Sequence, residues 1–588
     1  MKKMISAFLL MTMLFVLTFV TACGEGGGAG RAPAAAGGDG LGYRFTWTAD
    51  ATTLNPHATV SLATADLHAW TNSGLFRRVP TPDRNNSHII PDIASGPPVS
   101  VDADGLVWHI PLRPYAVFHN GTPITAHTFE QSFRWLLSPR LVNLMANFLY
   151  GGAGSIVIQN GRQYFTQDPP TAWEDVGIRA VDDHTLEIIT TRPFRQDQVM
   201  SHFLDRSTMP VYIELYAAGM NADGTETTYG TTLDNFMSAG PFFYDTWVVD
   251  AEHIFIRNPD HWLAEHFHFD RVSIRIVPDA GARMLLFEAG EIDLVPIELA
   301  QFVQFQDDPR IRFLTGVMPT HIDINNLNED QPILQTLDFR RALQWGIDRA
   351  SISILTNMPA QPTYIGPEAG TFMGDGTPFR NTPQGQLNWP PNYGFDPVRS
   401  RAYFDAALAE AGVDFVSLRW LYSDANAAHR VAGEFLEQHL PQIWGADRFE
   451  LILQSAPSAT VGSQRNWRET VDFDITITAW ATAAQRLFPH QAFTHMISPA
   501  SRPNPFLPDT FLEAWHRAQE LTAEIPLNYT ALLDAAAELE AIWMYYVINV
   551  PVWQGVTFNL VSERIETGMN HFMPAIGFGM MFGREAAR

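Results

Sequence analysis

The chain contains a single cysteine, Cys23, among its 588 residues. One thiol cannot form an intramolecular disulfide, so no covalent cross-link is available to hold the fold. Hydrophobic residues make up 46% of the chain and aromatic residues 12%, which is ample for large buried cores and excludes a disordered protein. We therefore expect a chain that is held together by apolar packing.

The cysteine follows a segment that is typical of secretion signals. Two lysines precede an apolar run from Met4 to Val20, which is the order of the basic and apolar regions in a signal peptide. The stretch VTAC, which ends at Cys23, resembles the lipobox of bacterial lipoproteins, where the cysteine is lipidated and becomes the new N-terminus. We expect a signal peptide over 1–22 and an acylated Cys23. The alternative is a transmembrane anchor with an incidental cysteine.

Residues 23–40 are nearly all Gly, Ala and Pro and cannot bury apolar surface, so we expect a flexible tether. The folded part then begins near Leu41 and has roughly 550 residues, which exceeds one core and indicates two or three domains. No later stretch approaches the length of an apolar membrane span. We expect a soluble body outside the cytoplasmic membrane, in the periplasm or on the outer face, that contacts the membrane only through its lipid anchor.

The only lysines are Lys2 and Lys3, so the mature chain would have none. A P-loop needs a lysine and so does Schiff-base chemistry, which excludes P-loop ATPases, kinases and pyridoxal enzymes. The net charge of −25 becomes −27 without these two residues, and such a surface repels nucleic acid and anionic lipid. We expect no nucleic-acid partner.

Motifs for metals and catalysis are weak. Residues 102–105 begin like a calcium loop, but Arg113 stands at the twelfth position where a bidentate Glu belongs, so we expect a turn. His261, His266 and His268 are candidate metal ligands, although histidines beside aromatic residues more often stack or face solvent. No GxSxG elbow or HExxH helix is present. We expect no cofactor, no metal and no catalytic residue.

Hydrophobic periodicity predicts a mixed α/β protein. The predicted strands are residues 43–48, 106–112, 185–190, 254–257, 474–480 and 545–553. The predicted helices are a helix capped by Thr125 and residues 338–350, 396–412, 426–444 and 529–544.

Six stretches, in the same order, resemble one family of proteins. They are PDIASGPPVSVDADGLVWHIPLRPYAVFHNGTPITAHTFEQSFRWLLSP, DDHTL, SAGPFFYDTWVVDAEHIFIRNPDHW, GEIDLVP, INNLN and DFRRALQWGIDR. The family is the extracellular solute-binding proteins of ABC importers, of the oligopeptide- and dipeptide-binding type (solute-binding protein family 5).

The resemblance implies an α/β, three-domain periplasmic-binding-protein-like fold, with two lobes around a ligand cleft plus an inserted small domain. Lobe I would combine 41–74, 200–309 and 555–588, the inserted domain would be 75–199, and lobe II would be 310–554. It also implies a monomer that captures a solute, closes around it by a hinge, and presents it to ABC permease and ATPase subunits.

The resemblance breaks down where the family binds the amine of a peptide. In peptide-binding members a strand of the second lobe ends in GW, and an aspartate a few residues later pairs with the α-ammonium. Here the stretch is ITAWATAA, with Trp480 at the family tryptophan and Ala483 at the expected acid. No Asp or Glu occurs over 475–508. Because an unpaired buried ammonium costs several kcal/mol, a free peptide N-terminus should not be held here in the usual way.

Two interpretations of the ligand stay open. The ligand is a small peptide that pairs with the site by strand addition, while another acid holds its amine. Alternatively it lacks that amine and is an oligosaccharide, an opine-like compound or another organic solute, with Trp480 as a stacking platform and Arg468 as a partner for carboxylate or phosphate. A secreted hydrolase is a remote third possibility. The predicted ligand-binding residues are Ser61, Leu62, Ala63, Arg468, Ala479, Trp480 and Ala481.

Overall fold

The structure is a computed structural model that describes most of the chain between residues 42 and 586. The described residues are 42–58, 62–151, 156–297, 299–325, 328–365, 378–424, 426–457, 460–461, 473–479, 488–493, 497, 506–524, 526–573 and 576–586. Cys23, the predicted signal peptide and the predicted tether lie outside them.

A four-stranded sheet joins the first described strand to three strands from the middle of the chain. Its order is β1-β10-β9-β8, with β1 parallel to β10 and the other pairs antiparallel. On β1, alternation brings Tyr43 and Phe45 to one face, and Tyr43 also stacks on Trp70 of α1 (Leu62–Thr71) with ring centroids 6.0 Å apart. The strands are β1 (Gly42–Trp47), β8 (Phe242–Val248), β9 (Glu252–Arg257) and β10 (Arg271–Ile276).

A second four-stranded sheet lies within residues 99–189 and has the order β4-β5-β7-β6. Helix α2 (Ala126–Leu136) packs on β6 and β7 and buries Phe129 and Phe133 in a core shared with Trp108 and Ile110 of β5. The strands are β4 (Val99–Ser100), β5 (Val107–Pro111), β6 (Ile178–Asp182) and β7 (Thr185–Ile189).

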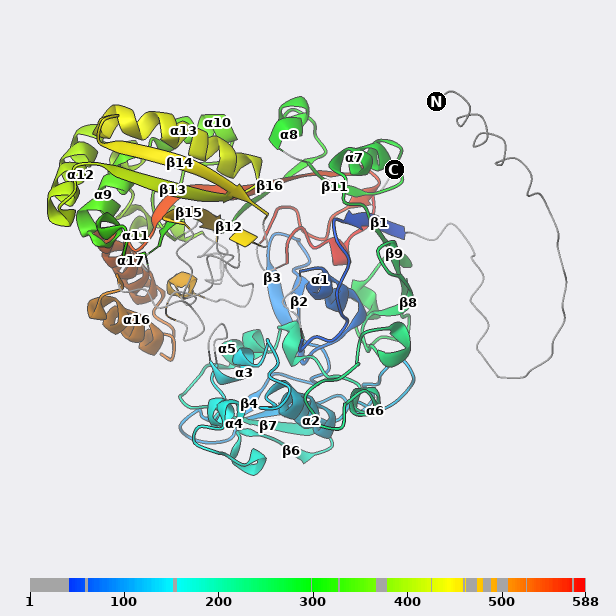
Figure 1. Ribbon diagram of the computed structural model, residues 1–588. Helices are drawn as coiled ribbons and strands as arrows, with labels where there is room; N and C mark the ends of the chain where they lie inside the picture. Colours follow the sequence, from blue (N-terminus) through cyan, green and yellow to red (C-terminus); the bar gives the residue numbers. More distant parts are fainter. Residues whose placement is uncertain are drawn as a thin grey trace, which may run out of the picture. The chain divides into compact units, whose positions relative to one another are not determined.

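The largest sheet has six strands in the order β11-β16-β12-β15-β13-β14 (Figure 1). In it β12 and β16 are antiparallel, whereas β13 is parallel to both β14 and β15. One apolar core joins this sheet to α9 (Leu337–Gly346), α12 (Pro397–Ala411) and α13 (Ala427–Trp444). A second core gathers around Trp543 of α17 (Tyr529–Tyr546). The strands are β11 (Leu294–Ile297), β12 (Ile311–Ile324), β13 (Val416–Ser423), β14 (Phe449–Ala456), β15 (Ile475–Ala479) and β16 (Val550–Val561).

The remaining described elements connect these sheets or cover them. Two short pairs of strands are β2 (Phe76–Pro80) with β3 (Ser87–Pro91), and β17 (Ile565–Glu566) with β18 (Arg584–Glu585). The other helices are α3 (Asn147–Tyr150), α4 (Gly161–Thr166), α5 (Gln196–His202), α6 (Ile213–Ala218), α7 (Ala280–Glu288), α8 (Leu299–Phe305), α9 (Leu337–Gly346), α10 (Arg349–Thr356), α11 (Pro383–Gln386), α12 (Pro397–Ala411), α13 (Ala427–Trp444), α16 (Asp509–Leu521) and α17 (Tyr529–Tyr546).

Most of the predicted elements are confirmed, and the helix ends show why. Asp396 caps α12 by accepting a hydrogen bond from the Arg399 N–H, and Gly412 ends the helix with a φ of 69°. Asn426 and Asn528 cap α13 and α17 in the same manner. The predicted turn at 102–105 is also present, because Asp102 accepts hydrogen bonds from the backbone of the strand that follows.

Two predicted elements are wrong in part. The helix predicted over 338–350 is two helices, because Asp348 accepts a hydrogen bond from the Ser351 N–H and starts α10 anew. The strand predicted over 545–553 begins only at Val550. Helix α17 continues through Tyr546 and ends at Val547, which has a left-handed φ of 46°.

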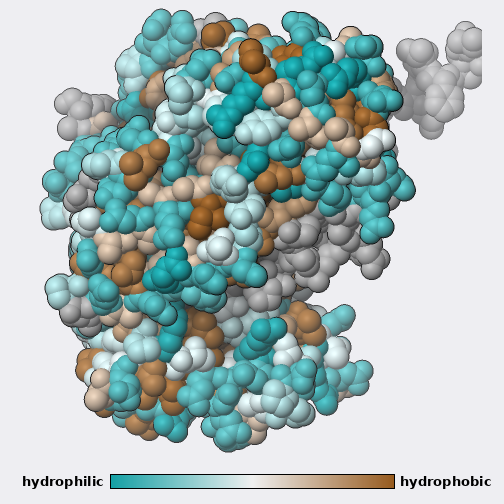
Figure 2. Space-filling model, turned by 90° about the vertical axis from the view of Figure 1, so that its left-hand side faces the viewer, coloured by the Kyte–Doolittle hydropathy of each residue, from teal (hydrophilic) through white to brown (hydrophobic). Residues whose placement is uncertain are grey.

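The predicted α/β class is confirmed by these sheets and helices. Within the described ranges, the helices are all too short or too polar to span a bilayer. On the face shown in Figure 2, hydrophobic residues form small separate patches among hydrophilic ones. The predicted boundaries of the two lobes and of the inserted domain stay a prediction.

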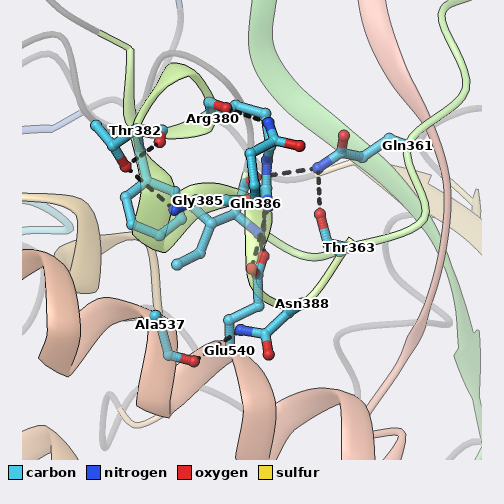
Figure 3. A network of polar contacts seen from close by, with 11 residues as sticks. Gln361, Thr363, Arg380, Thr382, Gly385, Gln386, Asn388, Ala537 and Glu540 are labelled. Carbon is cyan, nitrogen blue, oxygen red and sulfur yellow. Dashed lines mark hydrogen bonds and ion pairs between the residues drawn. The ribbon is translucent and has the colours of Figure 1, made fainter. Parts of the chain in front are cut away.

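A buried ion pair fixes the segment before α12 to helix α17 (Figure 3). Arg380 donates to both carboxylate oxygens of Glu540, at 2.8 and 3.2 Å, and their side chains are only 7% and 0% exposed. The same carboxylate accepts from the Ile365 N–H, and Arg380 also donates to the carbonyls of Ile365 and Gly385. Buried charges need such partners, so this network holds the segment in one position.

We predict that Glu540→Gln lowers the free energy of unfolding by about 3–5 kcal/mol, because it leaves the Arg380 charge buried without a counter-ion. The matched control is Glu538→Gln on the same helix. Glu538 pairs with Arg517 at 2.7 Å, but both side chains are about half exposed, so its loss should cost less than about 1 kcal/mol. Urea unfolding followed by tryptophan fluorescence measures both values. Equal losses for the two variants would contradict the prediction.

Candidate ligand-binding site

The strands β12 and β16 form a two-stranded ribbon that spans the largest sheet. At one end, β16 pairs with β11 through Phe558–Val561. Further along, β12 pairs with β15 through Thr320–Ile324. The ribbon therefore connects the strand near residue 294 with the strand near residue 475 through backbone hydrogen bonds.

The pairing of this ribbon is broken at its middle. The register of β12 against β16 shifts between Thr315 and Pro319, and again between Thr320 and His321. A bulge removes ladder hydrogen bonds and lets a strand bend locally. The ribbon thus has one place where its two ends can rotate relative to each other with few broken contacts.

At this place a third segment pairs with β16. The Gln554 N–H donates to the Pro359 carbonyl at 2.8 Å, and the Gln361 N–H donates to the Val552 carbonyl at 3.2 Å. The side chain of Gln554 is buried, yet neither its amide nitrogen nor its oxygen has a partner among the described residues. A buried amide without a partner is unusual and marks a position for a water molecule or a bound solute.

The segment before α5 contacts the end of α16. Arg192 donates to the Gln519 side chain at 3.0 Å, and Arg195 donates to the Thr522 carbonyl at 3.4 Å. The Arg195 guanidinium also lies over the Phe488 ring, 5.6 Å from its centroid. We name these residues the arginine contact.

Of the predicted ligand-binding residues, few fall where the structure describes them. Ala479 is the last residue of β15, half-buried and opposite Thr320 of β12, close to the bulge of the ribbon. Trp480, Ala481 and Arg468 lie outside the described residues, as does Ala483.

The predicted role of the segment at 61–63 needs a correction. Leu62 and Ala63 are the first residues of helix α1, and Ser61 lies outside the described residues. A helical backbone cannot add to an extended peptide as a strand, so Leu62 and Ala63 do not pair with a ligand in that way.

A cavity of about 600 Å³ lies beside β1 and α1, and sequence reasoning missed it. Its walls come from early and late parts of the described chain: β1, α1 and β2 on one side, and residues 576–582 on the other. Leu294 of β11 and Asn559 of β16 also line it, so it adjoins the ribbon. The one signal in the sequence was Asp66, a carboxylate within the otherwise uncharged helix LATADLHAWT.

The charges that line this cavity differ in their partners. Arg77 pairs with the buried Asp92 at 2.8 Å and donates to the carbonyls of Ala69 and Asn72. Asp66, in contrast, accepts no hydrogen bond from the described part of the chain. The Asp66 carboxylate reaches solvent through the cavity, but protein surrounds it so closely that burial raises its pKa to about 6, against the opposing influence of Arg206.

The histidines that were candidate metal ligands do not converge on a metal site. Both ring nitrogens of His261 are hydrogen-bonded, one to the Ser73 hydroxyl and the other to the Leu263 N–H. Across the described residues, no three His, Cys, Asp or Glu side chains are grouped as metal ligands.

Several other histidines are fully buried within the described chain. Burial lowers the pKa of His202 to about 3, and both of its ring nitrogens lack partners among the described residues. Burial also lowers the pKa of His57, His68 and His490 to about 3. These imidazoles are neutral in the folded protein at neutral pH.

Comparison with known proteins adds to this geometry. The family model for bacterial extracellular solute-binding proteins, family 5 Middle, matches residues 88–500. The chain is 22% identical over 446 residues to the probable D,D-dipeptide-binding periplasmic protein DdpA of Escherichia coli. This alignment covers 74% of this chain and 73% of that protein. It is 26% identical over 267 residues to the periplasmic oligopeptide-binding protein OppA of the same organism, covering 44% of this chain and 46% of that protein.

Solved structures show the same fold at lower identity. OppA of Listeria monocytogenes bound to peptide superposes with a TM-score of 0.69 at 18% identity, over 94% of this chain and 100% of that one. The substrate-binding domain of an oligopeptide ABC transporter from Bacillus anthracis gives a TM-score of 0.69 at 18% identity, over 93% of this chain and 100% of that one. These similarities confirm the predicted multi-domain solute-binding fold.

We predict that acid destabilises the protein between pH 6.5 and pH 4. The unfolded chain takes up protons on histidine near pH 6.5, whereas His202 in the folded chain does so only near pH 3, so the free energy of unfolding falls as the pH falls through this window. His202 alone should contribute a loss of about 2 kcal/mol at pH 5.

The test compares urea unfolding at pH 7 and pH 5 in wild type and in His202→Leu. The difference between the two pH values should shrink by about 2 kcal/mol in the variant. It should not shrink in His127→Leu, because His127 is 62% exposed. An unchanged pH dependence in His202→Leu would show that His202 titrates normally.

Proposed function

Because the chain belongs to family 5 of the bacterial extracellular solute-binding proteins, we propose that it is the substrate-binding component of an ABC importer. It captures a small peptide or peptide-like solute outside the cytoplasmic membrane and presents it to permease and ATPase subunits. The observation that carries this proposal is the match to the family over 88–500, together with relatives that are named as dipeptide- and oligopeptide-binding proteins. The protein acts as a monomer and carries out no chemical step.

The ribbon of β12 and β16 supports closure around the solute. Two strands that join two halves of a protein and share a short stretch of irregular register form a hinge, since rotation there disturbs few contacts. The arginine contact lies far from the bulge along the chain and joins the segment at 192–195 to α16. We infer that it stabilises the closed arrangement.

The choice of solute depends on the carboxylate that is missing from 475–508. A peptide remains the first candidate because the relatives are peptide-binding proteins, provided that another acid holds its amine. The missing carboxylate itself favours the second candidate, a solute without a free amine such as an oligosaccharide or an opine-like compound, which Trp480 would stack against and Arg468 would pair with. Mass spectrometry of the solute that co-purifies with the protein distinguishes them. Recovery of no solute, with no binding to peptide or sugar libraries, would contradict the proposed function.

The proposal includes a lipid anchor at Cys23, supported by the VTAC stretch after the apolar run. We predict that Cys23→Ser in the full-length chain releases the protein from the membrane fraction into the soluble fraction. Fractionation after expression in a bacterial host, with and without detergent, measures this. The anchor lies elsewhere if the Cys23→Ser protein is still cleaved before residue 23 and yet stays membrane-bound without detergent.

We also predict that the double variant Arg192→Ala, Arg195→Ala is more open than the wild type, because it loses the arginine contact. Small-angle scattering should give a larger radius of gyration for the variant without added solute. Arg140→Ala is the control, since Arg140 is exposed and its side chain donates, within the described residues, only to the Asp223 carbonyl. An identical radius in the double variant and the wild type would contradict a role of these arginines in closure.

A further inference from the structure

One glutamine side chain joins the arginine contact to a buried histidine. Arg192, in the segment before α5, donates to the side-chain oxygen of Gln519 on α16 at 3.0 Å. The side-chain nitrogen of Gln519 lies 3.0 Å from the Nε2 atom of His490, which is fully buried. The three side chains therefore form one chain of hydrogen bonds across the contact.

The chemistry of these groups fixes the position of the proton on His490. A guanidinium only donates hydrogen bonds, so Gln519 turns its oxygen toward Arg192 and its NH2 group toward His490. The Nε2 atom of His490 therefore accepts, and the neutral ring carries its proton on Nδ1, which has no hydrogen-bond partner among the described residues. The contact as observed requires a neutral His490.

A protonated His490 would place Gln519 between two donors. Both ring nitrogens of an imidazolium donate, whereas the Gln519 amide has one oxygen and can turn it either to His490 or to Arg192. If the oxygen turns to His490, the NH2 group faces the Arg192 guanidinium. If the oxygen stays with Arg192, the NH2 group faces the new Nε2–H of His490. One hydrogen bond of the chain is lost in either orientation.

The charged groups around His490 add to this conflict. Arg195 lies over the Phe488 ring, and that ring stacks on His490 with centroids 5.9 Å apart, while Asp197 is paired with Arg195 and half exposed. Burial and the charge of Arg192 lower the pKa of His490 to about 3. The other charged side chains of α16 and α17 are exposed, apart from Glu540, which is paired with Arg380. The exposed ones are Asp509, Glu513, His516, Arg517, Glu520, Asp534 and Glu538.

We propose that Arg192, Gln519 and His490 form a proton-sensitive latch, which holds the segment at 192–195 on α16 while His490 is neutral and releases it in acid. The inference rests on the closure described in the proposed function and adds a condition under which the protein opens. A solute that is held by the closed arrangement would then bind more weakly in acidic surroundings.

The direction of the effect follows from proton linkage. In the closed arrangement His490 takes up a proton only near pH 3, because it is buried and Arg192 is close. Opening removes Arg192, so the open arrangement binds the proton more tightly and acid favours it. The ratio of closed to open protein should fall between pH 7 and pH 5 by at most about 25-fold, the value for an open state with an ordinary histidine pKa of about 6.5.

The test measures the distance between the two sides of the contact in the full-length protein at pH 7 and pH 5. Because Cys23 is the only cysteine, a Cys23→Ser chain with Glu174→Cys and Glu513→Cys carries two spin labels at exposed positions. Residue 174 lies just before β6 and residue 513 lies on α16. Pulsed electron paramagnetic resonance should give a shorter distance at pH 7 and add a longer one at pH 5.

Two variants in this labelled chain separate the latch from a merely structural contact. In Gln519→Glu a carboxylate can accept from Arg192 and from a protonated His490 at once, so acid should no longer lengthen the distance. In His490→Gln an amide oxygen can accept in place of Nε2 but takes up no proton, so both pH values should give the same distance. His516→Gln changes an exposed histidine on α16 and should open in acid as the wild type does.

Acid unfolding does not imitate this pattern, because Gln519→Glu keeps every histidine of the wild type and should still stay closed. A wild-type distance that is the same at pH 7 and pH 5 would overturn the latch. So would a lengthening in acid that persists in both Gln519→Glu and His490→Gln.

The failure of the latch can be told apart from that of the proposed function. If the double variant Arg192→Ala, Arg195→Ala is more open at pH 7 but the wild type does not respond to acid, closure stands and the latch is wrong. If the double variant has the wild-type distance at pH 7, the arginine contact does not hold the closed arrangement. If no solute of any class binds, the receptor role itself is wrong.

Discussion

The pairing of β12 with β16 is the constraint on which the rest of the structure depends. These two strands carry the backbone ladder between the part of the sheet that contains β11 and the part that contains β15. A ladder of main-chain hydrogen bonds is stiff where it is regular and soft where its register shifts. The stretch with shifted register, between Thr315 and His321, is therefore the softest part of this ladder.

Buried arginines provide the second level of organisation. Arg349 donates to the carbonyls of Gln344, Pro551 and Tyr393, which joins α10 to the ribbon and to a distant loop. Burial lowers the pKa of Arg349 to about 9, so it stays charged at neutral pH. A guanidinium has five donors in a planar fork, whereas an ammonium has three at one point. A chain whose predicted mature part lacks lysine can thus still fasten several carbonyls with one side chain.

The same chemistry joins an early and a late segment of the described chain. Asp293 is fully buried and accepts hydrogen bonds from Arg44, near the start of the described chain, and from Arg564, near its end. Three segments that are far apart in sequence meet at this one carboxylate. It belongs to the stretch GEIDLVP, which the sequence offered only as part of a family resemblance.

Local chemistry made much of the fold predictable. A helix cap depends only on residues about three positions away. The starts of three helices could therefore be predicted from their caps, which are Thr125, Asp396 and Asn426. The helix predicted over 338–350 is broken at Ile347, and the hydrophobic pattern did not reveal this break. Ile347 is buried, as an apolar residue on the buried face of a continuous helix would also be. The pattern reported burial correctly but could not report that Asp348 starts a new helix.

The candidate site was less predictable for a physical reason. A cap acts within one turn, whereas the cavity beside α1 is closed by residues 576–582, more than 500 positions further along the chain than Asp66. No periodicity relates residues at such a separation. Tertiary contacts bring them together, among them the ion pair of Arg84 with Glu566 and the contact of Arg77 with the Met581 sulfur. The family resemblance directed attention to 475–508, where the expected acid is absent. The carboxylate that does line the cavity, Asp66, lies on α1 in a wall that residues 576–582 complete, so its surroundings are a property of the tertiary structure and not of any one motif.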